Sequence, residues 1–184
     1  SKPRFIAFAV PFGWILKPEE FEKGLDVLVS NRRRISPDSI DSRIKNYHWL
    51  DLVIGMYEAY DYGHDTVILT DEEGNISEGP GFNIFCVDEG TLYSPNKGVL
   101  EGITRQTVLD LAKELNVPFQ LNSISLEKLK NSNEVFATST AGGIMPITRI
   151  NGQPIEQGKP GEITRKLYKT YWEKHSDSSW SESI

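Results

Sequence analysis

Lys45 and Glu78 are the two side chains of this sequence whose surroundings most suggest chemistry. Lys45 belongs to the segment Arg-Ile-Lys-Asn-Tyr-His-Trp over residues 43–49. Glu78 belongs to the glycine-rich segment Ile-Ser-Glu-Gly-Pro-Gly-Phe-Asn over residues 76–83. A lysine amine forms a Schiff base with a carbonyl compound, and a carboxylate can hold a pyridinium nitrogen protonated. These are the two groups that the chemistry of pyridoxal phosphate (PLP) most needs.

The residues around Lys45 predict a partly buried amine. Ile44, Tyr47 and Trp49 are bulky and apolar, so they would form a wall beside it. Desolvation there would favour the neutral amine, which can form a Schiff base and move protons. The alternative is a surface lysine that precedes a helix, which is what most lysines are. Trp49 is interpreted either as a contact of the cofactor ring or as the first core position of that helix.

The glycines that follow Glu78 favour a flat ligand. Gly79 and Gly81 have no side chains, so the backbone could approach such a ligand closely. A glutamate beneath a ring nitrogen would keep it protonated and make the ring an electron sink. The alternative is an ordinary turn carboxylate in a glycine-rich hairpin. Glu78 lies 33 positions after Lys45, and the helix and strand expected between them could bring both residues to one pocket.

Two further segments offer donors to an anion such as a phosphate. Residues 102–104, Gly-Ile-Thr, begin an expected helix, where unpaired N–H groups and the helix dipole favour negative charge. An ordinary N-cap at Thr104 is the alternative. Ser139 and Thr140 leave an expected strand and lead into the glycine pair 142–143, which adds hydroxyl and amide donors.

Length and composition describe one ordinary globular domain. The chain has 184 residues, of which 38% are hydrophobic and 25% charged, and it is long enough for a proper core. The net charge of −6 and the lack of a long basic run argue against a nucleic-acid partner. The one dense basic cluster, the three arginines 32–34, is interpreted as a solvated strand end rather than an anion site.

Cysteine and histidine usage bear on compartment and metal binding. The single Cys86 lies in an apolar run, so we predict that it is buried in a strand, and it cannot form a disulfide within the chain. This fits a reducing compartment, and we expect a cytoplasmic protein. We find no signal peptide and no apolar span of about 20 residues, so no membrane partner is expected. The three histidines have no metal-binding spacing, and no metal site is expected.

Hydrophobic periodicity predicts an α+β chain with a barrel-like sheet and helices packed outside it. Helices are expected over 47–62, 104–115 and 160–175, and a short one over 126–130 with Ser125 as its N-cap. The predicted buried face of the first helix holds Trp49, Leu52, Val53, Met56 and Tyr60. That of the second holds Val108, Leu111, Ala112 and Leu115, and that of the third holds Ile163, Leu167 and Tyr171. Strands are expected over 4–10, 25–33, 65–70, 81–87, 91–94, 117–122, 133–138 and 145–150.

In order and spacing, the four segments resemble the fold-type IV (class IV) PLP-dependent aminotransferases over roughly residues 5–172. The resemblance implies their larger C-terminal domain, an α+β fold whose mixed β-sheet closes into a pseudo-barrel with flanking helices. It also implies that Lys45 is the catalytic Schiff-base lysine. The implied cofactor contacts are Lys45, Trp49, Glu78, Gly81, Phe82, Asn83, Ile103, Thr104, Ser139 and Thr140, and the implied substrate contacts are Thr140, Ala141 and Gly142.

The activity implied by the resemblance is a transfer of an amino group between an amino acid or amine and a 2-oxo acid. Residues 45–49, 81–84 and 140–147 are most similar to the (R)-selective amine transaminase and branched-chain aminotransferase-like branch. Gly143 stands where branched-chain and D-amino-acid aminotransferases usually carry an acidic residue. Two alternatives stay open: a class IV lyase similar to aminodeoxychorismate lyase, and a catalytically incomplete fragment or interaction domain.

Members of this family are homodimers and carry an N-terminal domain that contributes to the phosphate site and the substrate pocket. We therefore expect residues 1–184 to be the PLP-binding C-terminal domain, with the N-terminal domain absent from this chain. Residues 1–18 are expected to be an interdomain segment, and 176–184 a flexible tail. The apolar residues near the start, from Phe5 to Trp14, are expected to need a cover, which is typical of an interface.

Overall fold

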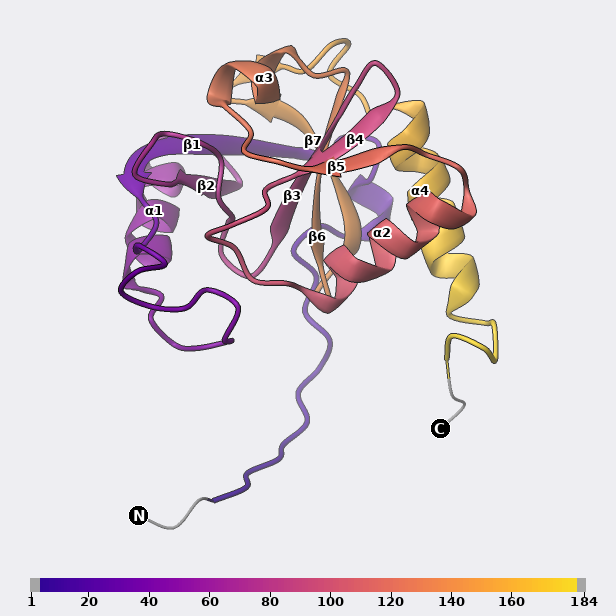
Figure 1. Cartoon of the computed structure of the whole chain (residues 1–184), viewed down its shortest axis with the longest axis horizontal. Coiled ribbons are helices and arrows are strands. Elements are labelled where there is room, and N and C mark those ends of the chain that lie inside the picture. The colour runs from indigo at the N-terminus through magenta and orange to yellow at the C-terminus, as the bar shows by residue number, and fades with distance from the viewer. Residues whose placement is uncertain (1–3, 182–184) are drawn as a thin grey trace.

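A computed structural model describes residues 4–181 of the chain (Figure 1). Its strands form one mixed sheet in the order β2-β1-β7-β6-β3-β4-β5, and β8 pairs with β7. The strands are β1 (Leu25–Arg33), β2 (Thr66–Thr70), β3 (Asn83–Asp88), β4 (Thr91–Ser94), β5 (Phe119–Leu121), β6 (Glu134–Ser139), β7 (Gly143–Ile150) and β8 (Gln153–Pro154). The helices are α1 (Leu50–Asp61), α2 (Ile103–Glu114), α3 (Leu126–Asn131) and α4 (Glu162–Lys174), with a 3-10 helix η1 (Pro18–Glu20).

The sheet mixes parallel and antiparallel pairs. β1 runs parallel to both β2 and β7, while β6 is antiparallel to β7 and β3. β3 and β4 form an antiparallel hairpin, and β5 joins β4 in parallel. Figure 1 shows α1 beside β1 and β2, and α2 and α4 next to each other on the opposite side of the molecule. The predicted α+β class, with a barrel-like mixed sheet and flanking helices, is confirmed.

Alternation along the strands divides the buried side chains between two faces of the sheet. In β2, Ile68 belongs to the largest core cluster, while Val67 and Leu69 face α1. In β6, Phe136 lies on the face that α2 and α4 cover, where its ring stacks on Phe85 with the centroids 5.1 Å apart. α1 therefore covers one apolar patch of the sheet, and α2 and α4 together cover another.

The predicted buried faces of α2 and α4 are confirmed, because their apolar stripes pack on the same cluster as Phe136. A carboxylate from the sheet also holds the start of α4. Glu134 of β6 accepts the backbone N–H groups of Ile163 and Thr164 at 3.0 and 2.7 Å. The N-cap of α4 is Gly161, which has no side chain for this task. A buried strand residue thus replaces the missing cap.

α1 differs from its prediction at both its start and its buried face. It begins at residue 50 rather than 47, and its buried residues include Gly55 and Ala59. A Cβ on Gly55 would lie 3.0 Å from a Leu69 methyl group, so small residues allow the helix to approach β2. This approach turns Tyr60 outward, where it is 52% exposed, and its predicted place on the buried face is wrong.

The strand predicted over 4–10 is wrong. Residues 4–14 have no strand partner among the described residues, and Phe5 is 93% exposed. A strand needs a neighbouring edge for its N–H and C=O groups, and this segment extends away from the sheet (Figure 1). It joins the body at Ile15, whose N–H donates to the Ala141 carbonyl at 2.8 Å. Residues 1–3 of the expected interdomain segment lie outside the described residues.

The remaining predicted strands and helices are found with small shifts of their ends, and Cys86 is fully buried in β3 as predicted. The Ser125 N-cap is confirmed, since its hydroxyl accepts the Lys128 N–H at 3.1 Å. β8 and η1 were not predicted. In the expected tail, 176–181 form turns around Asp177, and 182–184 lie outside the described residues. No helix within 4–181 is long and apolar enough to cross a membrane.

Candidate functional site

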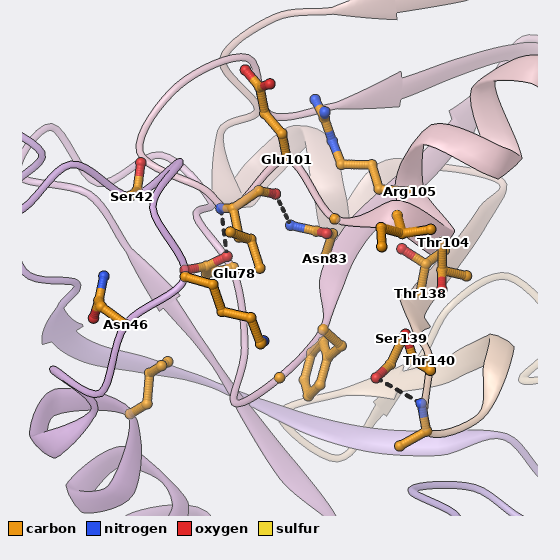
Figure 2. Close-up of a pocket in the computed structure, with 18 of the residues that line it drawn as sticks. Ser42, Asn46, Glu78, Asn83, Glu101, Thr104, Arg105, Thr138, Ser139 and Thr140 are labelled. Atoms are coloured by element: carbon orange, nitrogen blue, oxygen red, sulfur yellow. Dashed lines mark hydrogen bonds between the residues drawn. The ribbon is translucent and has the colours of Figure 1, made fainter. Parts of the chain in front are cut away.

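A cavity of about 460 Å³ lies between the loop before α1, the start of α2 and the end of β6 (Figure 2). Gly142 is the one predicted site residue that does not line it. Gly142 instead lies against Trp14 and Tyr168 at a separate small space, and its predicted substrate contact is not supported by this position. The predicted residues that do line the cavity are Lys45, Trp49, Glu78, Gly81, Phe82, Asn83, Ile103, Thr104, Ser139, Thr140 and Ala141.

Lys45 reaches the cavity from a loop, and its side chain is exposed. The predicted apolar wall does not form, because Ile44 is 64% exposed and Tyr47 fully exposed, and only Trp49 is half-buried. The physical reason is the late start of α1 at Leu50, which leaves these residues in a loop that does not pack on the sheet. The prediction of a partly buried Lys45 is therefore wrong for this chain by itself.

Glu78 is a buried carboxylate, 7% exposed, on the wall of the cavity. Its Oε1 accepts the Arg34 Nε–H at 3.2 Å. Its Oε2 accepts the Leu100 N–H at 2.9 Å, which Figure 2 shows as a dashed line. Burial raises the pKa of Glu78 above its ordinary value of 4.5, and the Leu100 hydrogen bond and the Arg34 charge oppose this rise. Because a carboxylate has about four lone-pair sites, Glu78 can still accept a bond from a ligand.

Arg34 is the buried partner of Glu78, and sequence reasoning missed it. Its Nη1 donates to Asp51 Oδ2 at 2.6 Å, and the same oxygen accepts the Ile35 N–H at 2.7 Å. The guanidinium thus joins the end of β1 to the first turn of α1 and to the cavity wall. The interpretation of 32–34 as a solvated strand end is wrong at Arg34, which is 8% exposed, while the other two arginines are exposed. Only packing distinguishes it from its neighbours.

The turn 79–82 leads the chain from Glu78 into β3. Pro80 takes the second position and Gly81 the third, with φ +83°, which a type II turn requires. The Gly79 N–H donates to the Phe82 carbonyl at 3.1 Å. The Phe82 ring fills the space where a Gly79 side chain would lie, so the predicted ligand approach at Gly79 is wrong. Gly81, by contrast, lines the cavity.

The start of α2 faces the cavity without a side-chain cap. Its N-cap is Gly102, so the alternative of an N-cap at Thr104 is wrong. The first N–H groups of a helix, here from Ile103 and Thr104, have no acceptor within the helix. Asn83 supports this start, because its Nδ2 donates to the Leu100 carbonyl at 2.8 Å. Its Oδ1 occupies the position that a side chain would take if residue 102 were not glycine. Such a helix start is suited to an anion.

The end of β6 places three polar residues along the cavity. The Ser139 hydroxyl accepts the Ala141 N–H at 3.1 Å and so orders the turn that follows (Figure 2). Thr140 is exposed at this turn. Thr138, which was not predicted, is 2% exposed, and its Oγ1 has no hydrogen-bond partner among residues 4–181. Thr138 also lines the cavity.

Sequence reasoning also missed Arg105 and Glu101. Arg105 is buried in the first turn of α2, where its Nε donates to Ser94 Oγ at 3.2 Å and its Nη2 to the Pro95 carbonyl at 2.8 Å. Burial lowers the pKa of Arg105, and the charge of exposed Glu101 opposes this. Cationic side chains outnumber anionic ones, which favours an anionic ligand. The charged residues that line the cavity are Arg34, Lys45, Arg105, Glu78 and Glu101.

A metal centre has no candidate in the described part of the chain. Within residues 4–181, no group of three or more His, Cys, Asp and Glu side chains is placed to hold a metal ion. The polar groups that line the cavity are an amine, carboxylates, guanidinium groups, hydroxyls and backbone N–H groups.

Comparison with known proteins identifies the family to which this chain belongs. The model of the family described as amino-transferase class IV matches residues 1–150. This is most of the chain, so the chain belongs to the class IV aminotransferase family, and the resemblance stated from its motifs is confirmed.

Its relatives are branched-chain aminotransferases. The chain is 34% identical over 170 residues to the branched-chain-amino-acid aminotransferase of Escherichia coli (strain K12), covering 91% of this chain and 55% of that protein. It is 33% identical over 173 residues to a putative branched-chain-amino-acid aminotransferase of Methanocaldococcus jannaschii, covering 93% of this chain and 59% of that protein. The chain thus spans somewhat more than half the length of these relatives.

Solved structures extend this similarity to the fold. A crystal structure of the Escherichia coli branched-chain aminotransferase matches with a TM-score of 0.86 at 32% identity, over 95% of this chain and 58% of that one. The Thermobaculum terrenum enzyme in its PLP form matches with a TM-score of 0.81 at 31% identity, over 86% and 53%. The expected pseudo-barrel fold of the class IV family is therefore confirmed.

The residues of the cavity fit the PLP that the family implies. The uncapped start of α2 offers backbone donors at Ile103 and Thr104, and the Thr138 hydroxyl lacks a partner within the described chain. An amine, Lys45, and a buried carboxylate, Glu78, line the same space. A volume of about 460 Å³ also lies within the usual range of small-molecule sites.

Proposed function

We propose that this chain is the PLP-binding part of a transaminase that moves an amino group between an amino acid or amine and a 2-oxo acid. The observation that carries the proposal is the position of Lys45 and Glu78 on one cavity that also contains the uncapped start of α2. This combination supplies an amine, a carboxylate and an anion site, which are the groups that hold PLP. When bound, PLP supplies an electron sink for the exchange of the amino group.

The roles of the chain's own residues follow from their positions. The Lys45 amine would hold the cofactor and would move a proton at the substrate carbon. Glu78 accepts a hydrogen bond from the protonated ring nitrogen, and Arg34 orients Glu78 through its Nε–H. The amides of Ile103 and Thr104 and the Thr104 hydroxyl bind the phosphate.

Further residues complete the proposed site around the ring and the substrate. Ser139 and Thr140 add donors for the cofactor at the end of β6, and Thr140 and Ala141 bind the substrate. Trp49 and Phe82 offer apolar contacts to the ring, while Gly81 leaves room for it.

Transamination is favoured over the class IV lyase because the relatives are named aminotransferases. Mixing the full-length protein with 2-oxoglutarate and a donor distinguishes the two, since transfer yields glutamate whereas the lyase releases pyruvate from its own substrate. The donor class is tested by comparing leucine with a primary amine that lacks a carboxylate. Faster transfer from leucine would place the protein with the branched-chain enzymes, and faster transfer from the amine with the amine transaminases.

The assignment of Lys45 is tested by borohydride reduction of the protein mixed with PLP, followed by peptide mass mapping. We expect a pyridoxyl group on Lys45. Lys45→Ala should lose both label and transfer activity without a loss of thermal stability, because this side chain is exposed. Lys97→Ala, at an exposed lysine outside the cavity, is the matched control. A label on another lysine in the wild type would refute the assignment.

Assembly and location belong to the same proposal. We propose that the full-length protein contains a further, N-terminal domain, forms a homodimer and acts in the cytoplasm. The support is the exposed cavity loop, the exposed segment 4–14 and the relatives' greater length. The catalytically incomplete fragment remains the alternative for residues 1–184 alone.

A further inference from the structure

Thr138 has a buried hydroxyl that forms no hydrogen bond within residues 4–181. Its side chain is 2% exposed, and Oγ1 has no hydrogen-bond partner among residues 4–181. Burying a hydroxyl without a partner is unfavourable, and most buried hydroxyls in proteins are paired. Valine has nearly the same shape and an equal preference for strands, so packing alone does not require a hydroxyl here.

The register of the sheet fixes the direction of this hydroxyl. Side chains alternate along β6, so Thr138 lies on the same face as Phe136, the face that α2 and α4 cover. Ser139 lies on the other face. On the neighbouring strand β3, Asn83 pairs directly with Thr138, and directly paired residues share a face.

Asn83 connects this face to the start of α2. Its side chain holds the Leu100 carbonyl and packs against Gly102, the N-cap of α2. Asn83 thus links Thr138 to the uncapped helix start, and Thr138 and Thr104 both line the cavity (Figure 2). The residue with the unpartnered hydroxyl and the uncapped helix start therefore line the same cavity.

We propose that the Thr138 hydroxyl is a further ligand of the cofactor phosphate, and that it donates to a phosphate oxygen beside the amides of α2. This inference rests on the proposed function and adds a binding residue to it. A phosphate monoester suits the position, because helix-start amides and a buried hydroxyl are all donors, and Arg105 in the same helix turn adds positive charge.

The test is Thr138→Val in the full-length protein, with affinities for PLP and for pyridoxal, which lacks the phosphate. We expect the variant to bind PLP about tenfold or more weakly, since a hydrogen bond to a charged group is lost. Its affinity for pyridoxal should not change. The cofactor-free variant should unfold at the same or a higher temperature, because the removed hydroxyl has no partner there. Thr138→Ser, which keeps the hydroxyl, should retain PLP affinity.

Thr148→Val is the matched control. Thr148 is equally buried in a strand, but its hydroxyl already donates to the Lys23 carbonyl at 2.6 Å. This variant should unfold at a lower temperature and keep the wild-type ratio of PLP to pyridoxal affinity. Equal losses for PLP and pyridoxal in Thr138→Val, a loss of cofactor-free stability, or no change in PLP affinity would each overturn the inference.

Inorganic phosphate separates this inference from the proposed function. The thermal stability of the cofactor-free wild type should rise with added phosphate, and the rise should be smaller in Thr138→Val. Suppose that phosphate binding depends on Thr138 but PLP does not label Lys45. This result would contradict the proposed function, while Thr138 would still be a phosphate ligand. A wild type whose stability does not respond to phosphate would overturn the inference.

Discussion

At the scale of single residues, Glu78 and Arg34 form a buried ion pair on the cavity wall. Arg34 is shared between two carboxylates, Glu78 and Asp51, so neither acid has the whole of its positive charge. Removing one member of a buried ion pair usually destabilises a protein, because the partner is left charged and unpaired. This arrangement explains why burial still raises the pKa of Glu78 in spite of its hydrogen bonds.

The raised pKa of Glu78 predicts a pH dependence of stability. The folded, cofactor-free chain holds a proton on Glu78 more tightly than the unfolded chain does. The contribution of Glu78 to the free energy of unfolding is thus most favourable below its ordinary pKa of 4.5, and it falls as pH rises toward the raised folded value. Glu78→Gln cannot titrate there, so its stability relative to the wild type should improve as pH rises.

Chemical denaturation from about pH 4 to about pH 7 measures this difference, because that range begins near the ordinary pKa of a glutamate and extends above it. Glu72→Gln, at an exposed position, is the control and should show no such trend. A wild type that gains stability over Glu78→Gln with rising pH would show that ion pairing, rather than burial, dominates at Glu78.

At the scale of elements, the start of α2 depends on a contact between two strands and a helix. Asn83 Oδ1 occupies the position that a side chain on Gly102 would take, so this N-cap position favours glycine. Thr138 belongs to the strand beside Asn83, so β3, β6 and α2 together form the proposed phosphate site. The cavity therefore relies on tertiary contacts rather than on a single loop.

Gly102→Ala should destabilise the cofactor-free protein by about 1–3 kcal/mol, since its Cβ would overlap Asn83 Oδ1. The same change in an Asn83→Ala background should have a smaller effect, because the obstructing atom is gone. A double-mutant cycle measured by chemical denaturation gives the coupling between the two residues. Additive effects would show that the contact with Asn83 does not limit residue 102.

The N-cap of α3 predicts a separate, smaller effect. Ser125→Ala should lower the free energy of unfolding by about 1 kcal/mol, because the Lys128 N–H loses its acceptor. Ser123→Ala, two residues earlier and exposed, should change it by less than about 0.5 kcal/mol. Equal effects in the two variants would contradict a capping role for Ser125.

At the scale of the whole molecule, two regions are unusually exposed. The segment 4–14 carries Phe5, Phe8 and Phe12 on its surface, and the loop before α1 exposes Ile44 and Tyr47 beside the cavity. Monomeric proteins rarely expose so many large apolar side chains in one region. Both regions are therefore candidates for cover by the proposed N-terminal domain or by a second subunit.

We expect the full-length gene product to be a dimer that binds PLP more tightly than residues 1–184 do. The physical reason is that cover would remove water from the Lys45 loop and bury the apolar segment. Light scattering and cofactor titration on both proteins measure this. The idea is abandoned if residues 1–184 are monomeric and match the PLP affinity and transfer rate of the full-length protein.

The sequence by itself determined the features that depend on local pattern. The apolar stripes of α2 and α4 follow from their 3.6-residue period, and the Ser125 cap and the Pro80–Gly81 turn follow from backbone preferences of single residues. The predicted site residues other than Gly142 also line one cavity, because the family's motifs preserve spacing along the chain.

Only the tertiary structure decided which residues are buried, paired or left open. Arg34 looks like its two exposed neighbours in sequence, and contacts from distant segments alone bury it between Glu78 and Asp51. The same holds for the unpaired hydroxyl of Thr138 and for the exposed amine of Lys45. Whether a side chain is buried or paired depends on its contacts with residues that are distant in sequence. A local sequence pattern does not show which residues those are.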